Sequence, residues 1–217
     1  MCISVLRGFY TVRIARLNVE KSAADTRWVY ELLGGGINMR EVIIETERLI
    51  LRKYTRDDVD GLLEILSDPE TMRHYPSVYD RAGAERWLDW CFESYQRSGF
   101  GLWAIELKKS GEFIGDTGLT MQNIDDDVLP EIGYHINKKY WRRGFAKEAA
   151  SAVRDWAFSN TDLDAVYSYM KYSNSPSYHT AQSIGMRKVG EYPSPEDVVC
   201  YVYRITREEW QALTGKQ

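Results

Sequence analysis

The chain has 217 residues, 44% of them apolar, which is enough to bury one substantial core and less than the roughly 250 to 300 residues at which cores split. Its formal net charge of -4 argues against a nucleic-acid partner, because proteins that bind nucleic acids usually present a basic face. Three scattered cysteines are too few for a disulfide framework, and no apolar run approaches the roughly 18 residues that cross a bilayer, so we expect a cytoplasmic protein with no membrane partner.

The first 38 residues stand apart from the rest of the chain. They end in Gly34, Gly35 and Gly36, a run typical of a linker, shortly before Met39. Alternatively, Met39 is the true start, because glycine codons resemble a translated ribosome-binding site just upstream. We therefore treat residues 1–38 as an N-terminal extension without an assigned function and predict one domain over residues 39–217.

Hydrophobic periodicity over residues 39–217 predicts both strands and helices. They do not alternate strictly, and three consecutive strands indicate an antiparallel meander, so the class is α+β with a mixed, mostly antiparallel sheet of about seven strands flanked by helices. In chain order, we predict a strand at 49–52, a helix from the N-cap Asp57 to Leu66, a helix at 82–96, and strands at 102–107, 113–121 and 131–136. A helix at 144–159 and a strand at 165–170 follow, and then a helix with N-cap Ser175 and first residue Pro176 that stops at Gly185. The chain closes with strands at 187–192 and 198–205 and a short helix from Arg207.

Residues 134–149 read as a strand, a basic turn and a helix that begins near Gly144. The N–H groups in the first turn of a helix have no partner within the helix, and the helix dipole is positive there, so an anion binds them well. Gly144 lets a ligand approach the backbone closely. The basic residues indicate a site for a specific anion or, in the plainer interpretation, a solvated charged face. They are Lys138, Lys139, Arg142, Arg143 and Lys147.

Several other kinds of site are excluded by missing motifs. No Walker phosphate loop is present, and Gly99-Phe100-Gly101 precedes a predicted strand rather than opening a helix, as a dinucleotide site requires. No Gly-x-Ser-x-Gly elbow occurs. His74, His135 and His179 lack metal-ligand spacing, so we expect no metal.

In combination, six stretches of this sequence resemble the GNAT superfamily of N-acetyltransferases, and its RimJ/RimL-like branch in particular. They are Trp141–Ala146, Asn174–Ser177, Ile184–Met186, Glu47–Arg52, the helix after Arg56–Asp58, and Ile132–Tyr134. Each motif is weak alone, but their order and spacing are fairly specific, and the resemblance covers about residues 45 to 205. It implies a GNAT-like fold, an acyltransferase activity and acetyl-CoA as co-substrate.

The resemblance also implies where acetyl-CoA binds. Backbone N–H groups from about Arg142 to Lys147 hold the pyrophosphate, and the strand around Tyr134 to Ile136 pairs with the pantetheine arm. Asn174 hydrogen-bonds the same arm, although an ordinary turn or cap residue is the alternative interpretation. The residues expected at the cofactor are Tyr134, Ile136, Trp141, Arg142, Arg143, Gly144, Phe145, Ala146, Lys147, Asn174 and Ser177.

Acetyl transfer requires a neutral amine, because an ammonium group has no lone pair, so a base must remove a proton. Glu131, where many family members carry a glutamate, is the first candidate, with a strand-edge carboxylate as the alternative. His135 is the second, since strand alternation places it on the same face, although a strand histidine is often structural. Many GNAT enzymes protonate the leaving thiolate with a tyrosine at the position of Ala181, so a general acid stays unassigned among Ser177, Tyr178 and Ser183.

The acceptor pocket is expected between the first two helices and the strand loops, with His74, Tyr75 and Trp103 among its lining residues. The run Asp125–Asp127 either attracts a cationic amine or forms a hydrophilic turn.

Two functions stay open from the sequence. The first is an N-acetyltransferase that acts directly on a protein N-terminus or on a small amine. The second is a non-catalytic acyl-CoA-binding sensor, which the absence of a tyrosine at Ala181 favours and the presence of Glu131 opposes. A homodimer is also expected if the strands at 187–192 and 198–205 present an edge that needs covering.

Overall fold

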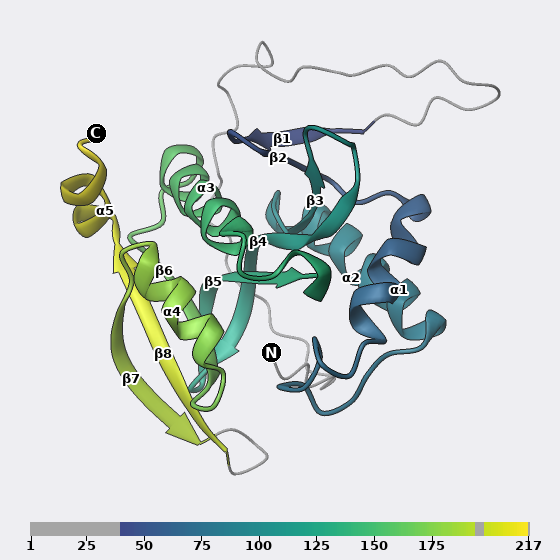
Figure 1. Cartoon of the computed structure of the whole chain (residues 1–217). Helices are drawn as coiled ribbons and strands as arrows, with labels where there is room; N and C mark the ends of the chain where they lie inside the picture. The colour runs from purple at the N-terminus through teal and green to yellow at the C-terminus, as the bar shows by residue number, and fades with distance from the viewer. Residues whose placement is uncertain (1–39, 194–197, 217) are drawn as a thin grey trace.

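The computed structural model describes residues 40–193 and 198–216, which form an eight-stranded sheet flanked by helices (Figure 1). The strand order is β1-β2-β3-β4-β5-β6-β8-β7, and neighbouring strands are antiparallel except for β5 and β6. The predicted α+β class with a mixed, mostly antiparallel sheet is confirmed.

The strands are β1 (Val42–Glu45), β2 (Leu49–Arg52), β3 (Leu102–Leu107), β4 (Phe113–Ile124), β5 (Asp127–Ile136), β6 (Ala165–Lys171), β7 (Arg187–Pro193) and β8 (Val199–Thr206). The helices are α1 (Val59–Leu66), α2 (Arg81–Ser98), α3 (Phe145–Asn160), α4 (Ser175–Ser183) and α5 (Arg207–Thr214), with short 3-10 helices η1 (Arg56–Asp58) and η2 (Lys138–Tyr140).

The described sheet has one strand more than the sequence predicts. The additional strand, β1, is four residues long, only partly buried, and pairs with β2 at the sheet edge. A short, half-exposed edge strand carries little of the periodicity on which the prediction rests. The proposed linker at residues 34–36 lies outside the described residues.

Two apolar clusters occupy the two faces of the sheet. One cluster joins α3, α4 and α5 to the sheet, and the other joins α1 and α2 to it (Figure 1). Successive strand residues point to opposite faces, so β3 contributes to both clusters. Leu102 and Ala104 pack toward α1 and α2, whereas Trp103 and Ile105 pack toward α3.

Two helix starts differ from the prediction by a small shift. Asp57 is not an N-cap: its neighbour Asp58 holds that position for α1, and the Asp58 carboxylate accepts the N–H of Thr55, the N-cap of η1, at 2.7 Å. Asn174, rather than Ser175, caps α4. In both cases an equally suitable polar residue stands beside the predicted one, so composition alone does not choose between them.

The acidic run forms the hairpin turn between β4 and β5. Asp125 and Asp126 have φ of 51° and 68°, the left-handed conformation that a tight two-residue hairpin requires. Both strands therefore extend further than predicted, and Asp127 already belongs to β5. The three carboxylates lie on the exposed end of the hairpin.

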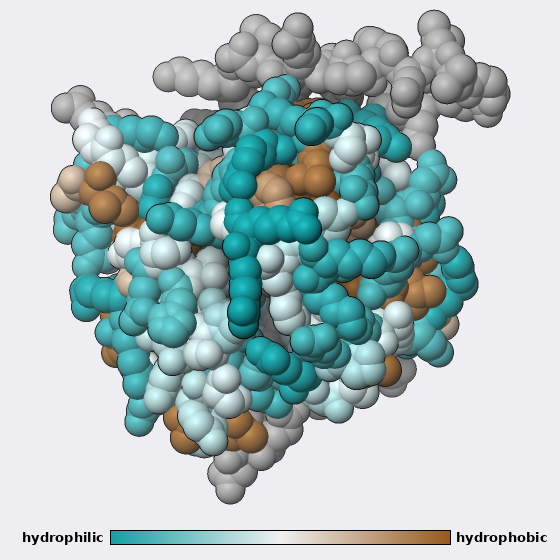
Figure 2. All heavy atoms as spheres, viewed as in Figure 1, coloured by the Kyte–Doolittle hydropathy of each residue, from teal (hydrophilic) through white to brown (hydrophobic). Residues whose placement is uncertain are grey.

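The face shown in Figure 2 is mostly hydrophilic, and its apolar residues form small, separate patches. No helix in residues 40–193 or 198–216 combines the length and apolar character needed to cross a membrane.

Candidate active site

A cavity of about 750 Å³ opens between β5 and β6. Glu131 and Tyr167 are the only residues that the two strands pair in the described chain, and the residues that follow them line the cavity. The turn before α3, the start of α4 and the segment 70–75 complete its walls. The cavity brings together most of the predicted site residues: Glu131, Tyr134, His135, Ile136, Trp141, Arg142, Gly144, Phe145, Ala146, Lys147, Asn174, Ser177, His74 and Tyr75.

Two predicted site residues do not line this cavity. Trp103 is buried on the opposite face of β3, where its ring packs against Trp156 at a centroid distance of 4.9 Å. Its position in the sequence suggested a lining residue, but its side chain packs toward α3 instead. The Arg143 guanidinium lies over the Tyr140 ring at 5.4 Å from the centroid, so only its backbone remains in the predicted turn.

The turn before α3 presents free backbone donors. Gly144 is the N-cap with φ of 79°, and no side chain caps the helix. The N–H groups of Phe145, Ala146 and Lys147 belong to the first turn, where the helix supplies no acceptor. Arg142 also adopts a left-handed φ of 60°. These two unusual backbone conformations bend the chain into a short turn that can cradle an anion.

Arg48, which the sequence reasoning did not place at the site, braces this turn. Its Nε donates to Glu148 Oε2 at 2.6 Å, its Nη1 donates to the Arg143 carbonyl at 3.0 Å, and its guanidinium covers the Phe145 ring at 4.4 Å. The Thr46 hydroxyl donates to Glu148 Oε1 at 2.6 Å. Although burial opposes ionisation, these hydrogen bonds lower the pKa of Glu148 below its ordinary value. The start of β2 is thereby tied to the first turn of α3.

Asn174, Ser177 and Tyr134 meet where α4 begins. The Asn174 side-chain oxygen accepts the Ser177 N–H at 3.4 Å, so it caps the helix and leaves its amide NH₂ for a ligand. The Tyr134 hydroxyl donates to the Ser177 carbonyl at 2.7 Å and lies 3.1 Å from the Ser177 hydroxyl. Both interpretations of Asn174 are therefore compatible with its geometry.

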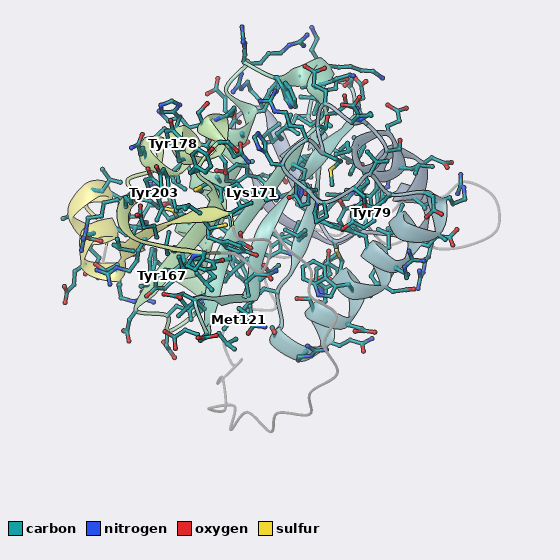
Figure 3. The ribbon with its side chains drawn as sticks, turned by 90° about the horizontal axis from the view of Figure 1, so that it is seen from below. Tyr79, Met121, Tyr167, Lys171, Tyr178 and Tyr203 are labelled. Carbon is teal, nitrogen blue, oxygen red and sulfur yellow. The ribbon has the colours of Figure 1, made fainter. Side chains whose placement is uncertain are left out.

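The other hydroxyls considered from the sequence lie outside the cavity lining. Tyr178 of α4 stacks on Tyr203 of β8 with centroids 6.4 Å apart, on the side of the molecule away from Tyr79 (Figure 3). Ser183 donates to the Thr180 carbonyl at 2.8 Å. Ala181 is fully buried in the core. Among these positions, Ser177 alone brings a hydroxyl to the cavity.

Glu131 is a buried carboxylate at the point where β5 and β6 part. Its side chain is nearly inaccessible, and its Oε2 has no hydrogen-bond partner among the described residues. Burial raises the pKa of Glu131 from 4.5 to about 7, against smaller opposing effects of His135 and a hydrogen bond from Thr120. The carboxylate is therefore poised to exchange a proton near neutral pH.

This burial predicts a pH-dependent stability. Because the folded-state pKa is raised, the contribution of Glu131 to stability is fully present below its ordinary pKa of 4.5 and is lost as the pH rises through about 7. The Glu131→Gln variant should therefore gain stability over wild type between about pH 5 and pH 8, by on the order of 3 kcal/mol at 1.4 kcal/mol per pKa unit. Urea unfolding at both pH values measures the difference, and an equal gap at both would contradict it.

His135 sits in a hydrogen-bonded network on the same face of β5 as Glu131. Its Nδ1 donates to Asp116 Oδ1 at 2.6 Å, and its Nε2 accepts from the Tyr75 hydroxyl. Its ring also packs edge-on against Trp87 at a centroid distance of 5.4 Å. Asp116 and the Tyr75 contact were not predicted, since they come from β4 and from the segment before α2.

His74 lies beside Tyr75 at the cavity wall. Its Nε2 accepts from the Arg73 Nε at 3.1 Å. Partial burial, followed by the charges of Arg73 and Lys171, lowers the pKa of His74. We therefore expect His74 to be neutral at pH 7 and to act as a hydrogen-bonding wall residue.

A family model described as an acetyltransferase (GNAT) domain matches residues 48–187, well over half of the chain. The chain belongs to the GNAT family of acetyltransferases. As a GNAT protein it is an acetyl-transferring enzyme, and the predicted enzyme class is confirmed.

Several proteins resemble the chain in sequence or in fold. The uncharacterized protein YkkB of Bacillus subtilis is 32% identical over 142 residues, which cover 65% of this chain and 83% of that protein. The crystal structure of an acetyltransferase from Agrobacterium tumefaciens is 27% identical, with a TM-score of 0.66 over 81% of this chain and 98% of that one. RimL, described as a ribosomal L7/L12 α-N-protein acetyltransferase in complex with coenzyme A, is 16% identical, with a TM-score of 0.65 over 76% of this chain and 98% of RimL. RimL is thus among the structural neighbours, and at that identity the likeness concerns the fold.

Proposed function

We propose that this protein transfers the acetyl group of acetyl-CoA directly to a primary amine, with Glu131 as the general base. One observation carries the proposal: a buried carboxylate with a free oxygen and a turn of free backbone donors line the same cavity. An anion-binding turn and a proton acceptor are the two parts that this transfer requires.

The residues that line the cavity offer partners for each part of acetyl-CoA. The N–H groups after Gly144 take the pyrophosphate, with Arg142 and Lys147 as nearby positive charges. Residues 134–136 of β5, left unpaired on the side of β6, offer an edge to the amide groups of the pantetheine arm. Asn174 and Ser177 face that arm from the start of α4. The thioester then lies near Glu131.

The reaction follows from these positions. An acceptor ammonium loses a proton to Glu131, the neutral amine attacks the thioester carbon, the thiolate leaves, and the nitrogen gives up its second proton to form the amide. A thiol has a pKa near 8.5, so the thiolate departs without an obligatory acid, and the Ser177 hydroxyl is placed to assist it. Direct attack also explains why the site needs no enzyme nucleophile.

The acceptor class is either a protein N-terminus or a small amine. An α-amine with a pKa of about 7.7 to 8.0 matches a base near pH 7 better than a lysine-like amine of about 10.4. RimL is described as acting on the α-amine of a ribosomal protein. A relative in Aspergillus fumigatus, 27% identical over 186 residues, is described as an FsC-acetyl coenzyme A-N(2)-transacetylase.

A thiol-release assay with a panel of amines tests the proposal. The panel contains hexapeptides that begin with a free serine or alanine, spermidine and an aminoglycoside, each with acetyl-CoA. Turnover with at least one amine, and none with an N-terminally blocked peptide, is the expected result. Acetyl-CoA binding without turnover on any amine would instead favour the acyl-CoA sensor.

The brace formed by Arg48 predicts a selective defect. Arg48→Ala should raise the KM for acetyl-CoA about tenfold, because charge-assisted hydrogen bonds contribute roughly 1.5 to 3 kcal/mol each and their loss loosens the turn. Arg48→Lys should raise the KM less than Arg48→Ala does, since lysine keeps the positive charge but lacks the planar set of guanidinium N–H donors. The matched control is Arg97→Ala, which breaks an exposed pair with Glu93. Equal KM values in all four proteins would contradict the role of Arg48.

A further inference from the structure

Four side chains form an unbroken hydrogen-bonded chain that runs from the protein interior to the cavity. Tyr54 donates its hydroxyl to Asp116 Oδ2 at 2.9 Å, and the other carboxylate oxygen accepts the His135 Nδ1–H at 2.6 Å. This second bond leaves the His135 Nε2 lone pair to accept the Tyr75 hydroxyl. Of the four residues, only His135 and Tyr75 line the cavity. The chain therefore ends in a phenol oxygen that can accept a hydrogen bond from a ligand.

The chain is rigid and largely sealed from solvent. Asp116 is fully buried and His135 nearly so, and the imidazole is held between the rings of Tyr75 and Trp87, each with its centroid 5.4 Å away. The His135 imidazole can take up a proton at Nε2 and remain hydrogen-bonded to both of its neighbours, Asp116 and Tyr75.

Tyr75 and Glu131 act on the same space in the cavity. Burial, followed by the negative charges of Glu131 and Asp116, raises the pKa of the Tyr75 phenol well above its ordinary value. Tyr75 therefore stays protonated and passes a proton on only when it receives another. Glu131, whose Oε2 has no hydrogen-bond partner among the described residues, lines the same cavity. An ammonium group placed there would meet two acceptors, one charged and one neutral.

The geometry points to Tyr75 as a second catalytic residue that, through His135 and Asp116, takes the second proton of the acceptor amine. This inference rests on the proposed function. The need for two acceptors comes from the reaction, because an ammonium group carries three hydrogens and the product amide nitrogen keeps one. Glu131 is a single carboxylate and can take one proton per turnover.

The proposed transfer removes two protons from the acceptor nitrogen. The acceptor R–NH₃⁺ gives its first proton to Glu131, and its nitrogen lone pair forms the C–N bond to the thioester carbon. The C–S bond breaks and the sulfur leaves as a thiolate. The nitrogen gives its second proton to the Tyr75 oxygen while the Tyr75 hydroxyl proton moves to His135 Nε2. An imidazolium paired with Asp116 remains, and its proton and that of Glu131 return to the thiolate and to solvent.

Two variants separate proton transfer from simple packing. Tyr75→Phe keeps the ring and removes only the oxygen that touches the amine. His135→Gln keeps an acceptor for the Tyr75 hydroxyl and a donor for Asp116, but it cannot carry a proton. Each should lower kcat by about 100-fold, within the usual range for acid–base catalysis, with the acceptor that has the highest kcat/KM in the amine panel. The double variant should lose no more than the larger single loss, because the residues act in one path.

The measurements that accompany kcat decide between the outcomes. Calorimetric Kd for acetyl-CoA should match wild type in both variants, and Tyr172→Phe, which alters an exposed tyrosine outside the cavity lining, should keep full turnover. Turnover of Tyr75→Phe within about twofold of wild type, or of His135→Gln within that range, overturns the relay. Absence of wild-type turnover on every amine overturns the proposed function instead, so the two failures are distinct.

Discussion

Replacing Gly144 with glutamate should nearly abolish acetyl-CoA binding, one of the two largest effects that we expect in this protein. The added carboxylate would stand at the N-cap of α3, beside the N–H groups proposed to hold the pyrophosphate. The left-handed φ of 79° adds a backbone cost of roughly 1 to 2 kcal/mol for a residue with a Cβ. Calorimetric titration of acetyl-CoA should give a Kd at least about 100-fold larger than that of wild type. This corresponds to a loss of roughly 2.8 kcal/mol or more in the free energy of binding.

The control for this substitution is Gly144→Asn. Asparagine tolerates the left-handed conformation better than other side chains and brings no charge. A built Cβ at this position meets only the Arg48 guanidinium, at 3.5 Å, which is ordinary contact. Gly144→Asn should therefore fold and retain most of the acetyl-CoA affinity. Similar affinities of the two variants would mean that the anion does not bind at this turn.

Glu131→Gln should lower turnover by roughly 10²- to 10⁴-fold while leaving the Kd for acetyl-CoA unchanged. Glutamine preserves the size of the side chain but cannot accept the proton of the amine. In wild type, kcat/KM should rise with pH through about 7, where burial places the pKa of Glu131, because the base acts only when it is deprotonated. His135 and Tyr75 line the same cavity and remain in the variant, so any pH dependence of kcat/KM that persists there does not come from Glu131.

The stability of Glu131→Gln gives a second test of Glu131 as the general base. Glu131→Gln should be the more stable protein near pH 8, as the cost of a buried ionised carboxylate disappears. Loss of turnover combined with gained stability is the pattern of a functional residue that the fold tolerates at a cost. Unchanged turnover across the pH range would remove Glu131 from the mechanism.

The elements of this site were predictable where the signal is local in sequence. The helix after Gly144 and the strand that carries Glu131 and His135 follow from periodicity, and alternation places both side chains on one face. Trp103 was expected at the pocket from its position alone, and alternation offers no check there, because β3 is buried on both faces and an almost continuous apolar strand does not reveal its parity.

The unpredicted parts of the site join residues that are distant in sequence. Arg48 contacts Glu148, 100 positions further along, and neither has a spacing signal that points to the other. The contact of Tyr75 with His135 spans 60 positions and depends on how the segment before α2 returns to the sheet. Side-chain networks of this kind require the fold before they can be seen.

The most direct test of the account follows the acetyl group itself. Wild-type protein is mixed with acetyl-CoA and a hexapeptide that begins with a free serine, and mass spectrometry reads both the peptide and the protein after a single turnover. We predict one acetyl group on the peptide amine, none on the protein, and none on the same peptide with a blocked N-terminus, with spermidine and an aminoglycoside run in parallel. Acetyl-CoA that stays intact in the presence of every amine, or an acetylated protein in place of an acetylated amine, would contradict direct transfer.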